Sequence, residues 1–428
     1  VEPQMLQGSD ENLMDLVIAV EEQSTAEVQF GVTLSGIGSA STSFPLSGLV
    51  KWNEKNLGGL GKTVGLELNA SPTDQDLTLS YSDSWLFGKR ISGSASLSFK
   101  HQSLTTAQDI LGPIFDDGVP DPYTSLEEYE DAGTISSVYK MPYEYWSLTF
   151  GLSTGYSMHT PAGDLGFGIG FTSSLYNTVY DTAKYRPASA DIRDTANQWL
   201  WTNKIPVRAY LNDLDLWYNP SSGYYASQKF TWAGLLTSIE SQKYIRSDTR
   251  LDGFLTLFDI PVFENWNLKW VLGAHSALNV IMPQPGAAEA VVSSSDDLRI
   301  DGTFVGRGWS SLYSVDEGRA LWDNWLEIRM PIIPQYFWLD GFLDVDVLRT
   351  SSGLVAIGSD SATASDSVLG WDNLVMSAGV GLRFTLMQFP FRFYFAKRFS
   401  FDGNAIDWTP AGSDGGIDFV ISVSQSLN

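Results

Sequence analysis

Large apolar residues occupy every second position in several segments of the chain, and glycine or serine fills most of the positions between them. The clearest segments are 91–99, 145–153, 165–171, 374–384 and 417–424. A period of two residues predicts β-strands with one apolar face, since successive side chains of a strand point to opposite sides of its sheet. The chain is therefore expected to be an all-β protein.

The face opposite the large side chains carries few lysines or glutamates. A soluble β-sandwich would show charge on its outer face, whereas a membrane barrel turns large apolar groups toward lipid and small polar groups toward its lumen. Lipid offers no partner to a free backbone amide, so a sheet crosses it only as a closed barrel. The pattern favours a transmembrane barrel, and a soluble all-β protein is the alternative.

Clusters of Pro, Gly, Asn and Asp divide the chain into about sixteen strands, joined by short links that alternate with long ones. One short rim and one long rim are typical of bacterial outer-membrane barrels. Residues 25–428 are thus predicted to form a 16-stranded antiparallel transmembrane β-barrel with short periplasmic turns and long extracellular loops. The first strand is expected at residues 26–36 and the last at 416–427.

The chain of 428 residues carries 50 acidic and 26 basic side chains, a formal net charge of -24. Such a charge repels phosphate, so nucleic acid and anionic membrane surfaces are not expected as partners. The chain has no cysteine, and its three histidines, His101, His159 and His275, are widely spaced. A disulfide framework is excluded, and a zinc site of nitrogen and sulfur ligands is not expected.

One segment imitates a phosphate-binding loop, because Gly58, Gly59 and Gly61 precede a lysine and a threonine. That loop needs another glycine where this chain has Asn56, and it needs a following helix, whereas strand-like alternation follows here. The segment is interpreted as a tight periplasmic turn. The sequence contains no Gly-x-Ser-x-Gly elbow and no histidine with a local triad partner, so no enzyme is predicted.

Arg307, Gly308 and Trp309 fall in the middle of the longest link, and Glu327 and Asp344 lie on the two strands that follow. Carboxylates that point into a lumen are costly unless a cation joins them, and one planar guanidinium can bridge two of them. The three charged residues are therefore candidates for an anchor between the loop and the inner wall. The alternative is an exposed loop arginine and two acids wetted by the lumen.

These residues resemble motifs of the BamA-type outer-membrane assembly factors, which belong to a wider superfamily of two-partner-secretion and chloroplast import barrels. Arg307-Gly308-Trp309 resembles the Arg-Gly-aromatic motif at the tip of the family's sixth outer loop, with Gly306 in place of the usual aliphatic residue. Glu327 is similar to the acidic residue of the family's twelfth strand. Asp344 is similar to the aspartate of the family's thirteenth strand, although Asp346 stands where the family has glycine.

Two turns add to the resemblance, and their motifs occur in the family's order along the chain. Asn56, Gly58 and Gly61 lie in a segment similar to the family's Asn-x-x-Gly-x-Gly turn. Pro220 and Gly223 bound a segment that resembles its Pro-Thr-x-Gly turn. Residues 379–384 are similar to its penultimate hairpin, and residues 12–22 look like the last strand of the POTRA module that precedes such barrels.

The resemblance implies a protein of the bacterial outer membrane that inserts and folds other β-barrel proteins, with no cofactor, no metal and no covalent chemistry. The work would be done at a lateral gate between the first and last strands. Residues 1–24 are expected to be the end of the last POTRA module and the linker to the barrel, the preceding modules being absent from this chain. The gate residues are expected to be Val28, Phe30, Val32, Phe419, Ile421 and Val423.

The partners implied are nascent outer-membrane proteins, outer-membrane lipid and accessory lipoproteins bound through the missing POTRA modules, and nucleic acid is not among them. Two other barrel functions fit the pattern, a porin and a TamA-like or two-partner-secretion transporter. A secreted carbohydrate-binding β-protein would also account for the 15 tryptophans. A need for detergent would separate the membrane barrels from that last alternative.

Overall fold

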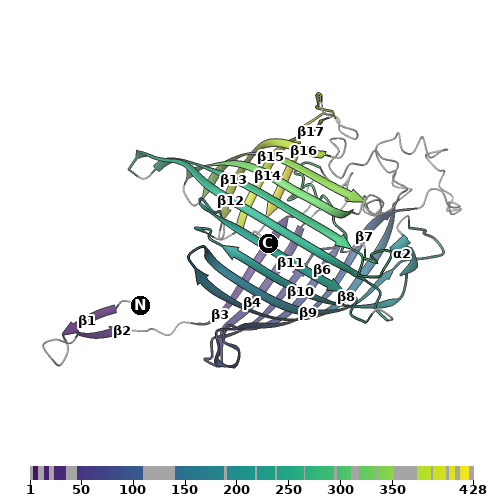
Figure 1. Cartoon of the computed structure of the whole chain (residues 1–428), viewed down its shortest axis with the longest axis horizontal. Helices are drawn as coiled ribbons and strands as arrows, with labels where there is room; N and C mark the ends of the chain where they lie inside the picture. The colour runs from purple at the N-terminus through teal and green to yellow at the C-terminus, as the bar shows by residue number, and fades with distance from the viewer. Residues whose placement is uncertain are drawn as a thin grey trace.

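The described strands β3 to β19 close into one barrel, and every pair of neighbours with an assigned register is antiparallel (Figure 1). The computed structural model describes residues 3–7, 14–18, 24–34, 46–108, 140–187, 190–216, 219–236, 239–264, 266–293, 296–309, 318–333, 336–350, 374–386, 389–401, 404–409 and 415–423. Within them, sixteen barrel strands have six residues or more, as predicted, and the additional strand β18 has two.

The first half of the barrel contains β3 (Ala26–Leu34), β4 (Leu46–Leu57), β5 (Lys62–Ala70), β6 (Asp74–Asp83), β7 (Ser92–Ala107), β8 (Lys140–Thr160), β9 (Gly163–Val179) and β10 (Trp199–Asn212). The second half contains β11 (Gly223–Ala233), β12 (Tyr244–Phe263), β13 (Trp266–Met282), β14 (Gly318–Ile333), β15 (Phe337–Thr350), β16 (Leu374–Leu386), β17 (Phe389–Phe401), β18 (Ile406–Asp407) and β19 (Asp418–Val423). The described links contain two short helices, η1 (Leu86–Gly88) and α2 (Ala190–Asp194).

The large apolar side chains lie on the outer face of the wall, as the alternation predicted. On β8, Leu148, Phe150 and Leu152 are 41–45% exposed, whereas Ser147, which precedes Leu148 and faces the other way, is buried. Isolated soluble domains rarely leave so many large apolar groups uncovered, and here they follow the strands around the barrel. The outer wall is therefore the lipid-facing surface. No helix among the described residues is long and apolar enough to cross a membrane.

The two rims differ from the predicted alternation at two links. The link of residues 71–73 between β5 and β6 is short although it lies on the long-loop rim. The link of residues 213–222 between β10 and β11 is long although it lies on the periplasmic rim. The reason for the second exception is that this link folds into the lumen, as described below.

The predicted ends of the first and last strands are less accurate than their positions. β3 begins at Ala26 as expected, while residues 35–36 lie outside the described part. β19 begins at Asp418 rather than Gly416, because residues 416–417 have no strand pairing, and residues 424–427 lie outside the described part.

A separate antiparallel pair, β1 (Pro3–Gln7) and β2 (Met14–Ile18), lies apart from the barrel (Figure 1). Met14–Ile18 falls within the segment that resembles a terminal POTRA strand. The assignment of residues 1–24 to a POTRA module remains a prediction.

Candidate functional site

The link between β13 and β14, here called loop six, folds inward and carries Arg307 into the barrel. Asp301 accepts hydrogen bonds from the backbone amides of residues 303, 304 and 305 at 2.7–3.0 Å, which closes the turn before the arginine. Gly306 and Gly308 adopt φ values of 63° and 89°. Only glycine adopts this backbone region without strain, which explains Gly306 in place of an aliphatic residue.

Arg307 joins the two strands that follow loop six. Its Nε donates to Asp344 Oδ2 at 2.8 Å, its backbone amide donates to the same oxygen at 3.0 Å, and its Nη1 lies 2.6 Å from Glu327 Oε1. All three side chains are at most 5% exposed. Charge-assisted, bidentate contacts of this kind fix both the position and the plane of a guanidinium.

Two further arginines complete the charge balance of this cluster. Arg329 Nε donates to Glu327 Oε2 at 2.8 Å, and Arg383 bridges Glu327 at 3.3 Å and Asp340 at 2.8 Å. With Arg307 and Asp344, the cluster contains three arginines and three carboxylates, all buried. Buried charges are tolerated when they are paired in this way, because an unpaired one loses its hydration without compensation.

Aromatic rings hold the motif against the wall from its other side. The Arg307 guanidinium lies 3.8 Å from the Phe342 ring centre and 4.8 Å from that of Tyr394. A methyl group on Gly308 would stand 2.8 Å from the Ala396 side chain, so the backbone of the motif packs directly on β17. Trp309 is 5% exposed and its Nε1 donates to the Met376 carbonyl oxygen at 2.9 Å.

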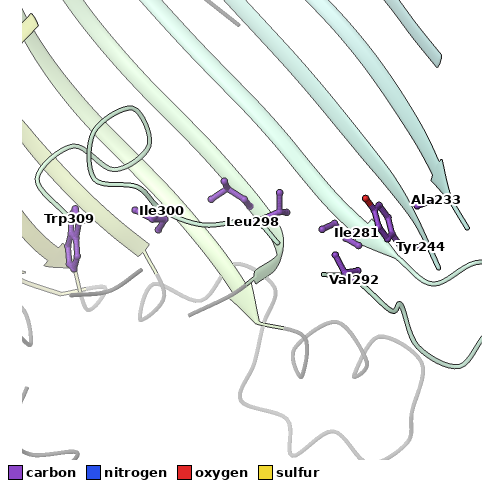
Figure 2. Close-up of a cluster of buried hydrophobic side chains, with 8 residues drawn as sticks. Ala233, Tyr244, Ile281, Val292, Leu298, Ile300 and Trp309 are labelled. Carbon is purple, nitrogen blue, oxygen red and sulfur yellow. The ribbon is translucent and has the colours of Figure 1, made fainter. Parts of the chain in front are cut away.

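Loop six is also held by an apolar cluster on the inner wall (Figure 2). Val292, Leu298, Ile300 and Trp309 come from the loop, and they pack with wall residues that belong to four strands. The wall residues are Ala233, Tyr244, Ile281 and Leu321. Burying each large side chain is worth about 1.5–3 kcal/mol, so this packing adds to the ionic anchor.

The β10–β11 link enters the periplasmic end of the lumen and reaches the same charge cluster. Asn219 Oδ1 accepts a hydrogen bond from Arg383 at 3.1 Å. Ser221 binds Lys269 of β13 through its hydroxyl at 2.9 Å, and its carbonyl accepts from Thr256 of β12 at 2.9 Å. Pro220 is fully buried. The link therefore lies across the mouth of the lumen.

The two turn motifs have a clear geometric basis. Gly58 and Gly61 have φ values of 65° and 66°, and Asn56 Oδ1 accepts the Gly61 amide at 2.7 Å. β5 follows directly, as expected for a tight turn rather than a phosphate loop. Gly223 has φ of 97°, and a side chain there would stand 2.0 Å from the Asp213 carbonyl oxygen.

The proposed gate residues lie on the two neighbouring strands β3 and β19. Val28, Phe30 and Phe419 are 53%, 75% and 43% exposed, and Ile421 is half-buried. Val32 and Val423 belong to the strands, but their side chains lie outside the described part. The structure thus brings the first and last strands together at one seam.

A sequence profile of the Omp85 superfamily domain matches residues 56–423. The chain belongs to the Omp85 superfamily. A Treponema pallidum (strain Nichols) protein named "Putative outer membrane protein assembly factor" is 31% identical over 420 residues. That match covers 94% of this chain and 49% of the relative, so the chain spans about half of the relative's length.

Solved structures of other barrels share the fold at low sequence identity. BamA from Haemophilus ducreyi lacking POTRA domains 1–3 aligns with TM-score 0.60 and 15% identity, over 99% of this chain and 75% of that one. CdiB from Acinetobacter baumannii aligns with TM-score 0.55 and 10% identity, over 99% and 64% of the two chains. CdiB from Escherichia coli aligns with TM-score 0.54 and 12% identity, over 99% of this chain and 66% of that one. The Omp85 fold and its apolar outer wall place the chain in the bacterial outer membrane.

Several residues of this Omp85 site were not identified from the sequence. Arg329 and Asp340 have the same inward parity as Glu327 and Asp344, so a search for charged residues at lumen-facing positions would have found them. Asn219 offers no such signal, because its contact with Arg383 depends on a link folding across the lumen. The loop-six apolar cluster is likewise non-local.

Proposed function

We propose that this Omp85 barrel inserts and folds β-barrel proteins in the outer membrane through a lateral gate between β3 and β19. The observation that carries the proposal is the seam between β3 and β19, which is short within the described residues. β19 has six residues and β3 has nine, so at least three residues of β3 extend beyond the described part of β19. An edge strand with free amides and carbonyls is a template for a further strand.

The neighbourhood of the seam supports the same mechanism. β17 has thirteen residues, and the described part of β19 pairs with six of them, from Phe391 to Ala396. Phe30 on the β3 side is 75% exposed, more than other large apolar groups around the wall such as Leu148 at 41%. A strand of an incoming barrel would pair with β3 by backbone hydrogen bonds, while lipid covers its apolar face.

The charge cluster would give this gate a fixed inner support. Loop six is bound to β14 and β15 through Arg307, and it contacts β17 through Gly308. β17 is the strand on which β19 pairs. A firmly held wall next to a strand whose described part has six residues confines opening to the seam. This arrangement needs no nucleotide or bound cofactor, because backbone pairing and lipid burial supply the free energy.

The partners are proposed from the family and the relative's name: nascent outer-membrane proteins as substrates, lipid around the barrel, and accessory lipoproteins that bind POTRA modules in the whole protein. A porin is the competing function. The lumen contains loop six and the β10–β11 link among the described residues, and this filling disfavours a wide solute path.

Disulfide locking of the seam tests the proposal, and the chain's lack of cysteine gives a clean background. Pairs that combine Val28→Cys or Phe30→Cys with Phe419→Cys or Ile421→Cys are made in the full chain and reconstituted in vesicles. Oxidation is expected to stop folding of a barrel substrate, followed by its heat-modifiable gel mobility, and reduction should restore it.

The matched control is the pair Val50→Cys and Leu68→Cys, which face each other in the β4–β5 register. Oxidation of this pair should leave insertion unchanged. Insertion that continues at the full rate with the seam locked would refute the gate. Solute conductance without insertion would favour the porin.

A further inference from the structure

The lipid-facing wall has an apolar groove with two cations at its edge, and we propose that it is a binding site for one anionic phospholipid of the periplasmic leaflet. The groove has a volume of about 630 Å³ and crosses the outer face of β8 to β11. This size is within the range of ligand sites, roughly 300–1,000 Å³. The proposal rests on the barrel's place in the membrane and not on insertase action.

The floor of the groove consists of exposed apolar side chains that stand side by side in the strand registers. Tyr156 pairs with Phe167, Ile169 with Val207, and Val207 with Phe230. Each is 46–51% exposed on the outer wall. A concave apolar surface on that wall suits an acyl chain, which gains the same burial there as in the bilayer and adds contacts with a fixed shape.

The cations come from the β6–β7 link, which folds outward over the rim. Leu86 packs on the outer face of Gly93, because a methyl group on that glycine would stand 2.2 Å from Leu86 Cδ1. The Leu86 amide donates to the Ile91 carbonyl at 2.9 Å, so the link is closed on itself. Lys89 and Arg90 lie inside this closed turn and line the groove.

The position of the link matches the depth of a lipid headgroup. Trp85 and Phe87 beside the cations are 61% and 95% exposed. Exposed aromatic residues at a strand end are typical of the membrane interface. The two cations therefore lie at the level of phosphate groups, with the apolar floor extending from them toward the membrane centre.

Neither cation is neutralised within the described part of the chain. The nearby Asp83 accepts the Trp85 amide at 2.8 Å and lies 3.7 Å from Lys62, and no described carboxylate pairs with Lys89 or Arg90. The net charge of -24 disfavours anionic surfaces for the chain as a whole. Charges beyond about 10 Å are screened, however, so two adjacent free cations decide the local preference.

The test compares retention of two lipids by the full chain folded in a zwitterionic detergent. Equal amounts of phosphatidylglycerol and phosphatidylethanolamine with identical acyl chains are added, the protein is re-isolated, and bound lipid is measured by mass spectrometry. Each cation contributes roughly a fivefold preference, so phosphatidylglycerol should be enriched by about 25-fold. The double variant Lys89→Gln with Arg90→Gln should lose this enrichment.

The control variant Lys184→Gln with Arg186→Gln removes the same charge from the β9–β10 link on the opposite rim. This control variant should keep the enrichment of phosphatidylglycerol. If the control variant loses the enrichment, the lipid is held by general charge attraction and the proposal is overturned. Equal retention of both lipids by the unmodified chain would also overturn it. Heat-modifiable gel mobility verifies that each variant is folded.

The apolar floor is tested separately. Val207→Asn should reduce retention of both lipids while the preference between headgroups remains. Free glycerol phosphate, which offers the headgroup without acyl chains, should not displace phosphatidylglycerol. Displacement by glycerol phosphate at equal concentration would show a phosphate site alone and would refute the lipid groove.

Discussion

Arg383 of β16 donates a hydrogen bond to Asn219 Oδ1 at 3.1 Å, although the two residues are 164 positions apart. Arg383 also binds Glu327, which holds Arg307 of loop six. A continuous polar chain thus runs through the lumen from the periplasmic link to the extracellular loop. Both ends of the barrel interior are fastened to the same buried carboxylate.

Replacing Arg307 by alanine should destabilise the barrel strongly. Glu327 would lose one of its partners, and Asp344 would keep no guanidinium partner among the described residues. Breaking a buried ion pair on one side costs about 3–5 kcal/mol. The expected result is a lower temperature for loss of the compact band in heat-modifiable gel electrophoresis.

Arg208→Ala is the control for this change, because Arg208 is exposed in the lumen and binds the Tyr225 hydroxyl. Arg208→Ala should lower the temperature at which the compact band is lost much less than Arg307→Ala does. The double variant Arg307→Met with Asp344→Asn removes both charges of one pair, while Glu327 keeps Arg329 and Arg383, so it should be more stable than Arg307→Ala. An Arg307→Ala barrel as stable as the unmodified one would disprove the anchor.

Gly308→Ala tests the close packing of loop six on β17. Gly308 has φ of 89°, and the added methyl group would stand 2.8 Å from Ala396 Cβ. Gly286 in the same loop has φ of 84° but has open space around it, so Gly286→Ala measures backbone strain alone. The Gly308 variant should lower the free energy that holds loop six in place by about 1–3 kcal/mol more than the Gly286 variant does. Protease cleavage of loop six on intact vesicles measures the difference, and equal cleavage rates would contradict close packing.

The sequence predicted the wall better than the interior. Alternation along each strand depends only on local spacing, so the strand count, the outward apolar face and the seam strands followed from it. Glu327 and Asp344 could be placed on inward positions for the same reason. Their partner Arg307 lies in a loop, which strand spacing does not describe, and it was identified from its place in the longest link and from the motif resemblance.

The missed features all depend on how links fold in three dimensions. The β10–β11 link was expected to be a short turn, and nothing in residues 213–222 shows that it crosses the lumen to Arg383. The outward fold of the β6–β7 link depends on the space left by Gly93 of the neighbouring strand. Contacts of this kind are set by tertiary packing, which strand periodicity does not encode.

Asn219→Gly should loosen the periplasmic end of the lumen. Asn219 has φ of 60°, which glycine adopts freely, so the variant removes the acceptor for Arg383 without backbone strain. We expect higher ion conductance in planar bilayers, because the link is released from β16. Asn219→Asp keeps an acceptor and should retain the low conductance. Identical conductance of the two variants would show that this contact does not hold the link.

The same link contains a carboxylate with a distinct pH dependence. Burial alone would raise the pKa of Asp215, but hydrogen bonds from the Ser221 hydroxyl at 2.6 Å and from the amides of Ser221, Ser222 and Leu216 lower it below the ordinary 3.8. A lowered pKa means that the charged form stabilises the folded link. That stabilisation is present above the ordinary pKa and is lost as the pH falls through the folded value.

Asp215→Asn isolates this contribution, since asparagine keeps the shape of the side chain but carries no charge. The difference in thermal transition between the unmodified chain and the variant should be largest near neutral pH and should vanish in acid below the folded pKa. Other acids titrate in both proteins and cancel in the difference. A difference that stays constant from neutral pH into that acid range would mean that the Asp215 charge does not stabilise the link, and its hydrogen bonds would then act through geometry alone.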